Sequence, residues 1–357
     1  MVTQLAGDGW ECHIAMPAPS PLAEEFAAAG AKVHVVPMRR LTASGGVAHW
    51  VGYLAAWPLT VGRLALLGRR LRVDVVHSNS LHSWYGWAVA ALLERPHVWH
   101  AREIVVQSAG ALRVERLLAS RFANRVVAIS DAVAAQLDGT NITVVRDGPD
   151  LAAFGPERAG AFRARVGIDD AALVVGALGR IDTWKGVDVL LDAMPELRRR
   201  RPEAVAAIAG PAVRGKEAYA DALAARAAAI PGVHWLGPRD DPAEMMADLD
   251  VFALPSTSPE PYGLVVVEAL ASGVPVVATA AGGPVEILAT AGSAAGHLVP
   301  PGDPEALAVA IAELLPAASS TLRRRARRSF DIAPPPAFGP LFDEVAAGGR
   351  RRPRRQR

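Results

Sequence analysis

The sequence predicts an α/β protein made of two parallel-sheet domains that face a cleft. Short apolar runs alternate along the chain with alanine- and leucine-rich stretches of helical spacing, a pattern typical of parallel sheets covered by helices. The pattern restarts after the turn at residues 147–149, and 357 residues exceed what one hydrophobic core usually supports. We therefore expect two domains, with a ligand bound in the cleft between them.

The expected strands are the short apolar runs that turn residues interrupt. They cover residues 11–17, 31–37, 73–79, 96–100, 125–130, 142–146, 173–178, 204–209, 233–236, 251–254, 274–278 and 297–299. We place the first domain at residues 1–148 and the second at residues 149–330. A C-terminal segment at residues 331–347 is expected to pack back on the first domain, and the arginine-rich residues 348–357 are expected to be disordered.

Composition favours a soluble, cytoplasmic protein. Hydrophobic residues make up 51% of the chain and charged residues 21%, and we predict no membrane span. Cys12 is the single cysteine and forms no internal disulfide, and no signal peptide precedes Gly7, which favours a reducing compartment.

Positive charge gathers near the carboxyl end and raises the question of an anionic partner. Arginines cluster at residues 323–328 and 350–357, without the interleaved aromatics of a nucleic-acid site, so we expect no nucleic-acid partner. We favour a solvated tail, with an anionic membrane surface as the alternative partner. The apolar stretch at residues 45–72 ends in arginines and has the same two interpretations. Because Pro58 interrupts it, we favour one or two core-facing helices over a helix on a membrane.

The first constellation with chemical meaning follows the strand at residues 173–178. Arg180 and Lys185 lie in the loop that leads into a helix beginning near Val187. Arginine offers a planar fork for phosphate oxygens, lysine a mobile point charge, and the helix start adds N–H groups that favour an anion. Taken alone, the pair is more typical of solvated loop residues.

A second constellation follows the strand at residues 251–254. Glu260 is expected in the loop at the carboxyl end of that strand, and Gly263 opens the next helix with N–H groups from Gly263, Leu264 and Val265. Glu268 lies further along the same helix. A diphosphate between these N–H groups and the two cations needs no metal ion to neutralise it.

The two glutamates, separated by seven residues that include Gly263-Leu264-Val265, resemble the signature of the retaining glycosyltransferases of family 4. The similarity extends from about Cys12 to Leu315. It includes residues 75–78, 127–131, 180–186, 250–256, 278–286 and 296–299. The resemblance implies the GT-B fold, in which two Rossmann-like domains face a cleft and the carboxy-terminal domain binds a nucleotide-sugar.

Matching positions imply roles for individual residues. Arg180 and Lys185 are expected to hold the donor diphosphate, Glu268 the ribose and Glu260 the donor sugar. The family also places a catalytic-site histidine after a strand of the first domain, and residues 96–103 are similar to that segment, so His100 is the candidate. The competing interpretation is that His100 is packed in the core.

These roles predict a metal-independent transferase that moves a sugar from an NDP-sugar to an acceptor hydroxyl with retention at the anomeric carbon. The acceptor is expected to be a carbohydrate or a lipid-linked molecule, in polysaccharide, glycolipid or glycoconjugate synthesis. Asp248 and Asp250 match the DxD pattern of metal-dependent sugar transferases, but they lie at the start of a strand, so we interpret them as a solvated turn.

Two alternatives stay open. A nucleotide-sugar epimerase or a phosphorylase on the same fold also binds phosphate in the cleft, and a non-catalytic nucleotide-sugar-binding remnant is the third interpretation. The family begins with a strand and a glycine-rich loop, whereas residues 1–9 resemble the end of a helix. We therefore expect the gene to start further upstream, and the polypeptide as written to be poorly stable or inactive.

Overall fold

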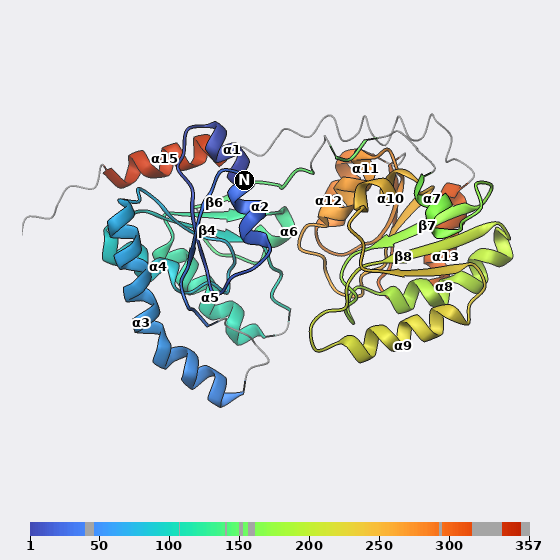
Figure 1. Cartoon of the computed structure of the whole chain (residues 1–357), viewed down its shortest axis with the longest axis horizontal. Coiled ribbons are helices and arrows are strands. Elements are labelled where there is room, and N and C mark those ends of the chain that lie inside the picture. The colour runs from blue at the N-terminus through green and yellow to red at the C-terminus, as the bar shows by residue number, and fades with distance from the viewer. Residues whose placement is uncertain are drawn as a thin grey trace, which may run out of the picture. The chain divides into compact units, whose positions relative to one another are not determined.

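The computed structural model describes residues 1–39, 46–106, 108–139, 141–149, 153–155, 161–292, 295–315 and 338–350. Residues 349 and 350 are described by their backbone only. The chain divides into two units (Figure 1). Unit 1 contains Met1–Asp147 with Pro336–Arg357, and unit 2 contains Gly148–Pro335. The division falls after residue 147, against an expected boundary after residue 148, and unit 2 ends at residue 335 rather than 330.

Unit 1 alternates helices and parallel strands, because its apolar runs are short and separated by helical segments. Its elements are α1 (Val2–Gly7), β1 (His13–Met16), α2 (Leu22–Ala28), β2 (Lys32–Val35), α3 (Val47–Leu71), β3 (Val76–Ser78), α4 (Gly86–Leu93), β4 (His97–Ala101), α5 (Ala109–Phe122), β5 (Arg125–Ala128), α6 (Asp131–Ala134), β6 (Ile142–Val144) and α15 (Phe338–Arg350). In the described residues these strands form two parallel sheets, β1-β2 and β3-β4-β5-β6.

Helix α15 completes the core of unit 1. It lies beside α1 (Figure 1), and Phe338 and Phe342 are buried together with Leu5 of α1 and Val98 of β4. Residues 338–347 of the expected C-terminal segment thus form part of a helix on unit 1, whereas residues 331–337 lie outside the described residues. The tail expected to be disordered from residue 348 begins inside α15, which continues to Arg350. Residues 351–357 lie outside the described residues.

In the described residues of unit 2 the strands form one six-stranded sheet. Its elements are α7 (Ala161–Val166), β7 (Leu173–Leu178), α8 (Val187–Arg200), β8 (Ala204–Ala209), α9 (Glu217–Ala228), β9 (Val233–Gly237), α10 (Pro242–Ala247), β10 (Val251–Leu254), α11 (Leu264–Ala271), β11 (Val276–Thr279), α12 (Gly283–Ala291), β12 (Gly296–Val299) and α13 (Pro304–Leu314). The strand order is β12-β11-β10-β7-β8-β9, and every pairing is parallel.

Buried side chains cover both faces of this sheet. One cluster packs α8 and α13 on one face, and a second packs α10 and α11 on the other. Strands β7, β8 and β10 therefore read as continuous apolar runs, as a parallel strand buried on both faces requires. In such a sheet the polar side chains that bind ligands gather in the loops beyond the carboxyl ends of the strands.

Candidate functional site

Two cations lie in the loop between β7 and α8, at the carboxyl edge of the unit 2 sheet. Arg180 is exposed, and among the described residues no carboxylate forms an ion pair with its guanidinium. Lys185 directly precedes Gly186, the residue that caps α8. Together with Gly179 and Pro255 they line a small hollow at this edge. The predicted pair of cations is therefore brought together within unit 2.

Lys185 is held by Glu260, 75 residues further along the chain. Its Nζ donates to Oε1 of Glu260 at 3.0 Å and to Oε2 at 2.8 Å, and the Ser256 hydroxyl donates to Oε2 at 3.2 Å. The ammonium also lies 4.2 Å from the ring centre of Trp184. The sequence predicted separate roles for Lys185 and Glu260, and the structure shows that they form one ion pair in which each orients the other.

Glycines bring the loop after β10 close to its neighbours. A Cβ on Gly186 would lie 1.9 Å from the Pro255 carbonyl oxygen, and a Cβ on Gly282 would lie 2.0 Å from the Glu260 carbonyl oxygen. Both glycines have positive φ, at 67° and 77°, which other residues adopt only with strain. The loop that carries Glu260 is thereby fixed between the starts of α8 and α12.

Asp182 holds the cationic loop from the other side. Its carboxylate accepts a hydrogen bond from the Thr183 backbone N–H at 2.7 Å and from the Trp184 indole N–H at 3.1 Å, and it also pairs with Lys216. These contacts occupy Asp182 within the loop and leave the neighbouring Arg180 side chain extending towards solvent. Sequence inspection missed Asp182, although an aspartate before a loop tryptophan and lysine is a recognisable turn signal.

The amino terminus of α11 offers free donors. Gly263 caps the helix with φ 89°, and Leu264 is 37% exposed. Among the described residues, no backbone acceptor bonds to the N–H groups of Gly263, Leu264 or Val265. Glu268 lies one turn further on and is half-buried; burial raises the pKa of its carboxyl group, and no partner for it occurs in the described part of the chain. A ligand with an anion and neighbouring hydroxyls satisfies both features.

In unit 1, the predicted catalytic residue His100 lies inside the core. Its ring is fully buried, 5.7 Å from the ring of Phe338 and 5.7 Å from that of His77, and both ring nitrogens lack a hydrogen-bond partner in the described residues. Burial, together with the charge of Arg102, lowers the pKa of His100 to about 3, so the imidazole is neutral at pH 7. The sequence predicted that His100 lies at the carboxyl end of its strand, facing the ligand, whereas in the structure its ring packs against α15. A catalytic role for His100 stays a prediction.

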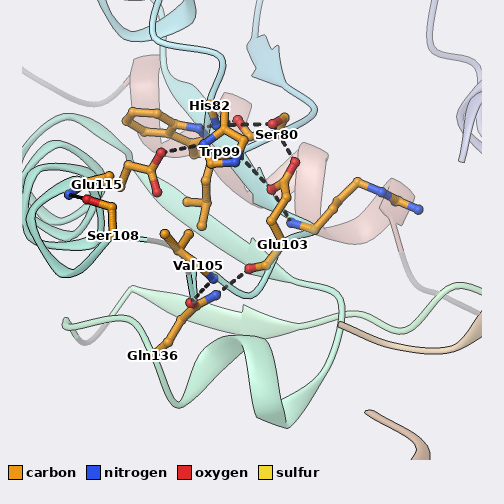
Figure 2. A network of polar contacts seen from close by, with 11 residues as sticks. Ser80, His82, Trp99, Glu103, Val105, Ser108, Glu115 and Gln136 are labelled. Carbon is orange, nitrogen blue, oxygen red and sulfur yellow. Dashed lines mark hydrogen bonds and ion pairs between the residues drawn. The ribbon is translucent and has the colours of Figure 1, made fainter. Parts of the chain in front are cut away.

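Arg102 and Glu103 occupy the carboxyl edge of β4. Figure 2 shows Glu103 at the centre of a network in which its carboxylate accepts from the Ser80 hydroxyl at 2.5 Å and its carbonyl oxygen accepts from the Gln136 amide. His82 pairs with the buried Glu115 at 2.6 Å in the same view, and hydrogen bonding to that carboxylate raises the pKa of His82. The network fixes the loops after β3 and β4, and sequence reasoning did not identify it.

The two aspartates of the DxD pattern are buried, so the prediction of a solvated turn is wrong. The guanidinium of Arg163 donates to Asp250 Oδ2 at 2.7 Å and to the Asp248 carbonyl oxygen at 2.7 Å. Asp248 Oδ2 accepts from the backbone N–H groups of Phe162 and Arg163 at 3.0 and 3.2 Å. Both carboxylates thus fasten α7 to the amino end of β10, away from the ligand-binding edge.

Two family profiles match the chain. Residues 1–152 match the profile of Glycosyltransferase Family 4, and residues 160–329 match that of Glycosyl transferases group 1. A D-inositol 3-phosphate glycosyltransferase of Catenulispora acidiphila is 32% identical over 74% of this chain and 68% of its own length. The chain belongs to glycosyltransferase family 4. A second enzyme of that name, from Salinispora arenicola, is 36% identical over 58% of this chain and 50% of its own length.

Solved structures of other proteins share the fold. Anabaena HepE in complex with UDP-glucose has a TM-score of 0.79 and 24% identity, covering 97% of this chain and 93% of HepE. A glycosyltransferase from Rickettsia africae has a TM-score of 0.78 and 17% identity, covering 98% and 93%. The predicted GT-B fold, an α/β architecture of two Rossmann-like units, is confirmed.

Proposed function

We propose that this family 4 transferase moves a sugar from a nucleoside diphosphate sugar to an acceptor hydroxyl with retention at the anomeric carbon and without a metal cofactor. The observation that carries the proposal is the carboxyl edge of the unit 2 sheet. There, an exposed arginine, an oriented lysine and the free N–H groups of α11 offer positive charge, and Glu268 offers an unpaired carboxylate. UDP is the leading candidate nucleotide because HepE, of the same fold, is known with UDP and UDP-glucose.

Each group has a distinct task. Arg180 and Lys185 neutralise the diphosphate together with the amino terminus of α11, so a divalent cation is not needed to stabilise the leaving group. Glu268 accepts hydrogen bonds from the ribose hydroxyls. Glu260 contacts the donor sugar while its ion pair keeps Lys185 directed towards the phosphate.

The main catalytic contribution comes from the positive charge that the enzyme places next to the departing diphosphate anion. In comparable sites such stabilisation lowers the activation free energy by several kcal/mol. Cleavage of the bond between the anomeric carbon and the phosphate oxygen leaves an anion that the cations and N–H groups are already placed to receive. The acceptor hydroxyl attacks from the same face, and its proton passes to the departing phosphate oxygen. Atoms and charge balance without an enzyme nucleophile.

The acceptor is a carbohydrate or lipid-linked hydroxyl, in polysaccharide, glycolipid or glycoconjugate synthesis. Enzymes named for inositol 3-phosphate are among the relatives, so a polyol phosphate is the rival acceptor to include in any assay.

Calorimetric titration with UDP, GDP and ADP tests the donor site. We expect the Arg180→Ala and Lys185→Ala variants to bind the preferred nucleotide at least about tenfold more weakly, since each loses a charge-assisted hydrogen bond to phosphate. Arg199→Ala and Arg226→Ala remove exposed arginines from α8 and α9, elsewhere in the same unit, and are expected to bind like wild type. Unchanged nucleotide affinity in both site variants would refute the assignment.

Incubation with the donor alone separates the transferase from the other enzymes. An epimerase changes the donor sugar without an acceptor, and a phosphorylase releases a sugar phosphate when inorganic phosphate is added. We expect neither product, and we expect transfer only when an acceptor is present. A protein that binds UDP-sugars but transfers to no acceptor is the non-catalytic remnant.

A further inference from the structure

Helix α3 presents an apolar face to solvent. Residues 47, 51, 54, 58, 62 and 66 follow the three- and four-residue spacing of one helical face and contain no charged or hydrogen-bonding side chain. Val47 is 81% exposed, Val51 61% and Leu54 59%, and beside them Leu59 is 59% and Leu66 51% exposed. A helix on the surface of a globular protein normally shows the opposite pattern, with polar residues outward.

The opposite face of α3 is embedded in unit 1. Tyr53, Val61 and Gly68 are buried, and α3 packs along α4. The Tyr53 ring lies 5.4 Å from that of Tyr85. The helix is therefore a fixed part of the unit with one free side, and it runs along the outside of unit 1 in Figure 1.

Two tryptophans of α3 pair with tryptophans of α4 and of the loop before it. Trp57 lies 5.7 Å from Trp87, which stacks on the partly exposed Phe122 at 4.5 Å between ring centroids. Trp50 pairs in the same way with Trp84 at 6.1 Å. Tryptophan favours the headgroup level of a bilayer, where its apolar ring and polar N–H both find partners.

The charged side chains of α3 itself are all arginines, and Asp74 follows shortly after the helix. Residues 26–73 contain seven lysines and arginines and no aspartate or glutamate. Arg63, Arg69 and Arg70 are exposed on the second half of α3, and Arg72 follows as its cap. Basic residues beside an apolar helical face attract anionic lipid headgroups, each contributing to affinity until salt screens it.

The helix fits a position on a membrane better than one across it. By length and composition α3 is able to cross a bilayer, yet one side is committed to the core of unit 1 and cannot face lipid. Arg63 also interrupts the apolar length. An axis parallel to the surface buries the exposed face and keeps the arginines among the headgroups.

We propose that the exposed face of α3, with its arginines, binds an anionic membrane surface and holds the enzyme there as a peripheral protein. The favoured core-facing interpretation of residues 45–72 describes only one side of this helix. The proposal is independent of the sugar donor, because the donor groups lie in unit 2.

Sedimentation with vesicles tests it, using phosphatidylcholine alone and phosphatidylcholine mixed with phosphatidylglycerol. We expect wild type to bind the mixed vesicles at low salt. A double variant, Leu54→Glu with Leu59→Glu, is expected to bind at least about tenfold more weakly, because two leucine side chains no longer enter the bilayer. Arg69→Gln with Arg70→Gln is expected to lose about tenfold on the anionic vesicles only. Leu22→Glu, a matched change at a 49% exposed leucine of α2, is the control and is expected to bind as wild type.

Three results would overturn the proposal: wild type that ignores anionic vesicles, equal loss in the Leu22 control, or a dimer in sedimentation equilibrium that the leucine variant dissociates. The last outcome would make this face an interface between copies. Nucleotide titration of the same leucine variant separates this test from the donor site. Unchanged UDP affinity is expected whether or not vesicles bind.

Discussion

Named polar groups at the carboxyl edge of the β3-β4-β5-β6 sheet in unit 1 have partners within the chain, whereas others at the carboxyl edge of the unit 2 sheet do not. In unit 1, the carboxylate of Glu103 and the amide of Gln136 are occupied by neighbouring loops (Figure 2). In unit 2, Arg180, Glu268 and the first N–H groups of α11 have no partner among the described residues. Satisfied polar groups fix a loop, whereas unsatisfied ones are completed by a ligand. The unit 1 groups therefore hold their loops in place, and we propose that the open groups of unit 2 bind the anionic part of the donor.

The largest expected effect comes from breaking the clamp on the unit 2 edge. In the Gly282→Val variant the new Cβ meets the Glu260 carbonyl oxygen at 2.0 Å, at a φ of 77° that valine does not tolerate. We expect a loss of more than about 3 kcal/mol of unfolding free energy and no measurable nucleotide binding. Urea unfolding and calorimetric titration measure the two effects.

Gly302→Val is the matched control, because its φ is 73° but no atom lies within 4 Å of the new Cβ. It is expected to cost only the strain of the left-handed conformation, about 1–3 kcal/mol, and to leave nucleotide affinity unchanged. Equal losses of stability and binding in both variants would show that backbone strain, and not the close approach to Glu260, explains the effect.

At the amino edge of the unit 2 sheet, as in the unit 1 network of Glu103, the charged side chains are paired with other groups of the protein. Arg163→Met removes a fully buried cation and leaves Asp250 buried without it. We expect a loss of about 3–5 kcal/mol in urea unfolding. Arg165→Met, two residues away and 48% exposed in its ion pairs, is expected to cost less than about 1 kcal/mol. Similar losses in the two variants would contradict the distinction between a buried and a surface ion pair.

The sequence predicted the elements better than the side-chain partners. Strands β7, β8 and β10 have the predicted bounds, because a short apolar run that turn residues interrupt is a local signal. Both cations and both glutamates of the candidate site also lie in unit 2, as the motif implied. The ion pairs of Lys185 with Glu260 and of Arg163 with Asp250 join residues more than 70 positions apart, which no local pattern reveals.

His100 shows why a strand edge is hard to place from sequence. The predicted strand ended at residue 100, which would put that side chain at the carboxyl end of the strand, next to the following loop. Strand β4 continues to Ala101, so the alternation of side chains directs His100 to the same face as Val98, where α15 packs. That face depends on residues 338–350, which are remote in the chain.

Acidification is expected to affect unit 1 more than unit 2. Burial lowers the pKa of both His77 and His100 to about 3, below the ordinary value of 6.5. Between these values the unfolded chain binds protons that the folded chain does not, so stability falls as the pH drops from about 6.5 towards 3. We expect each histidine to lower the free energy of unfolding by about 1–2 kcal/mol when the pH falls from 6.5 to 5, as measured by urea unfolding.

His100→Phe keeps a ring of similar size and is expected to lose less stability on acidification than wild type. His297→Gln, at a partly exposed histidine of β12 in unit 2, serves as the control because it leaves the core of unit 1 unchanged. If the His100→Phe variant lost as much stability on acidification as wild type, the prediction that His100 is buried as a neutral imidazole would be wrong. The same variant tests catalysis, because transfer activity that survives it excludes an essential proton-transfer role for His100.

The smallest predicted effect sharpens the assignment of Glu268. If its carboxylate accepts hydrogen bonds from the ribose, wild type binds 2′-deoxy- and 3′-deoxy-UDP about tenfold more weakly than UDP, which corresponds to about 1.4 kcal/mol. Glu268→Ala is expected to bind all three nucleotides with one reduced affinity, since the discriminating acceptor is gone. Glu313→Ala removes an exposed carboxylate from α13 and should keep the wild-type preference. A Glu268→Ala protein that still prefers UDP over its deoxy forms would move ribose recognition to another residue and leave the raised pKa of Glu268 as a consequence of burial alone.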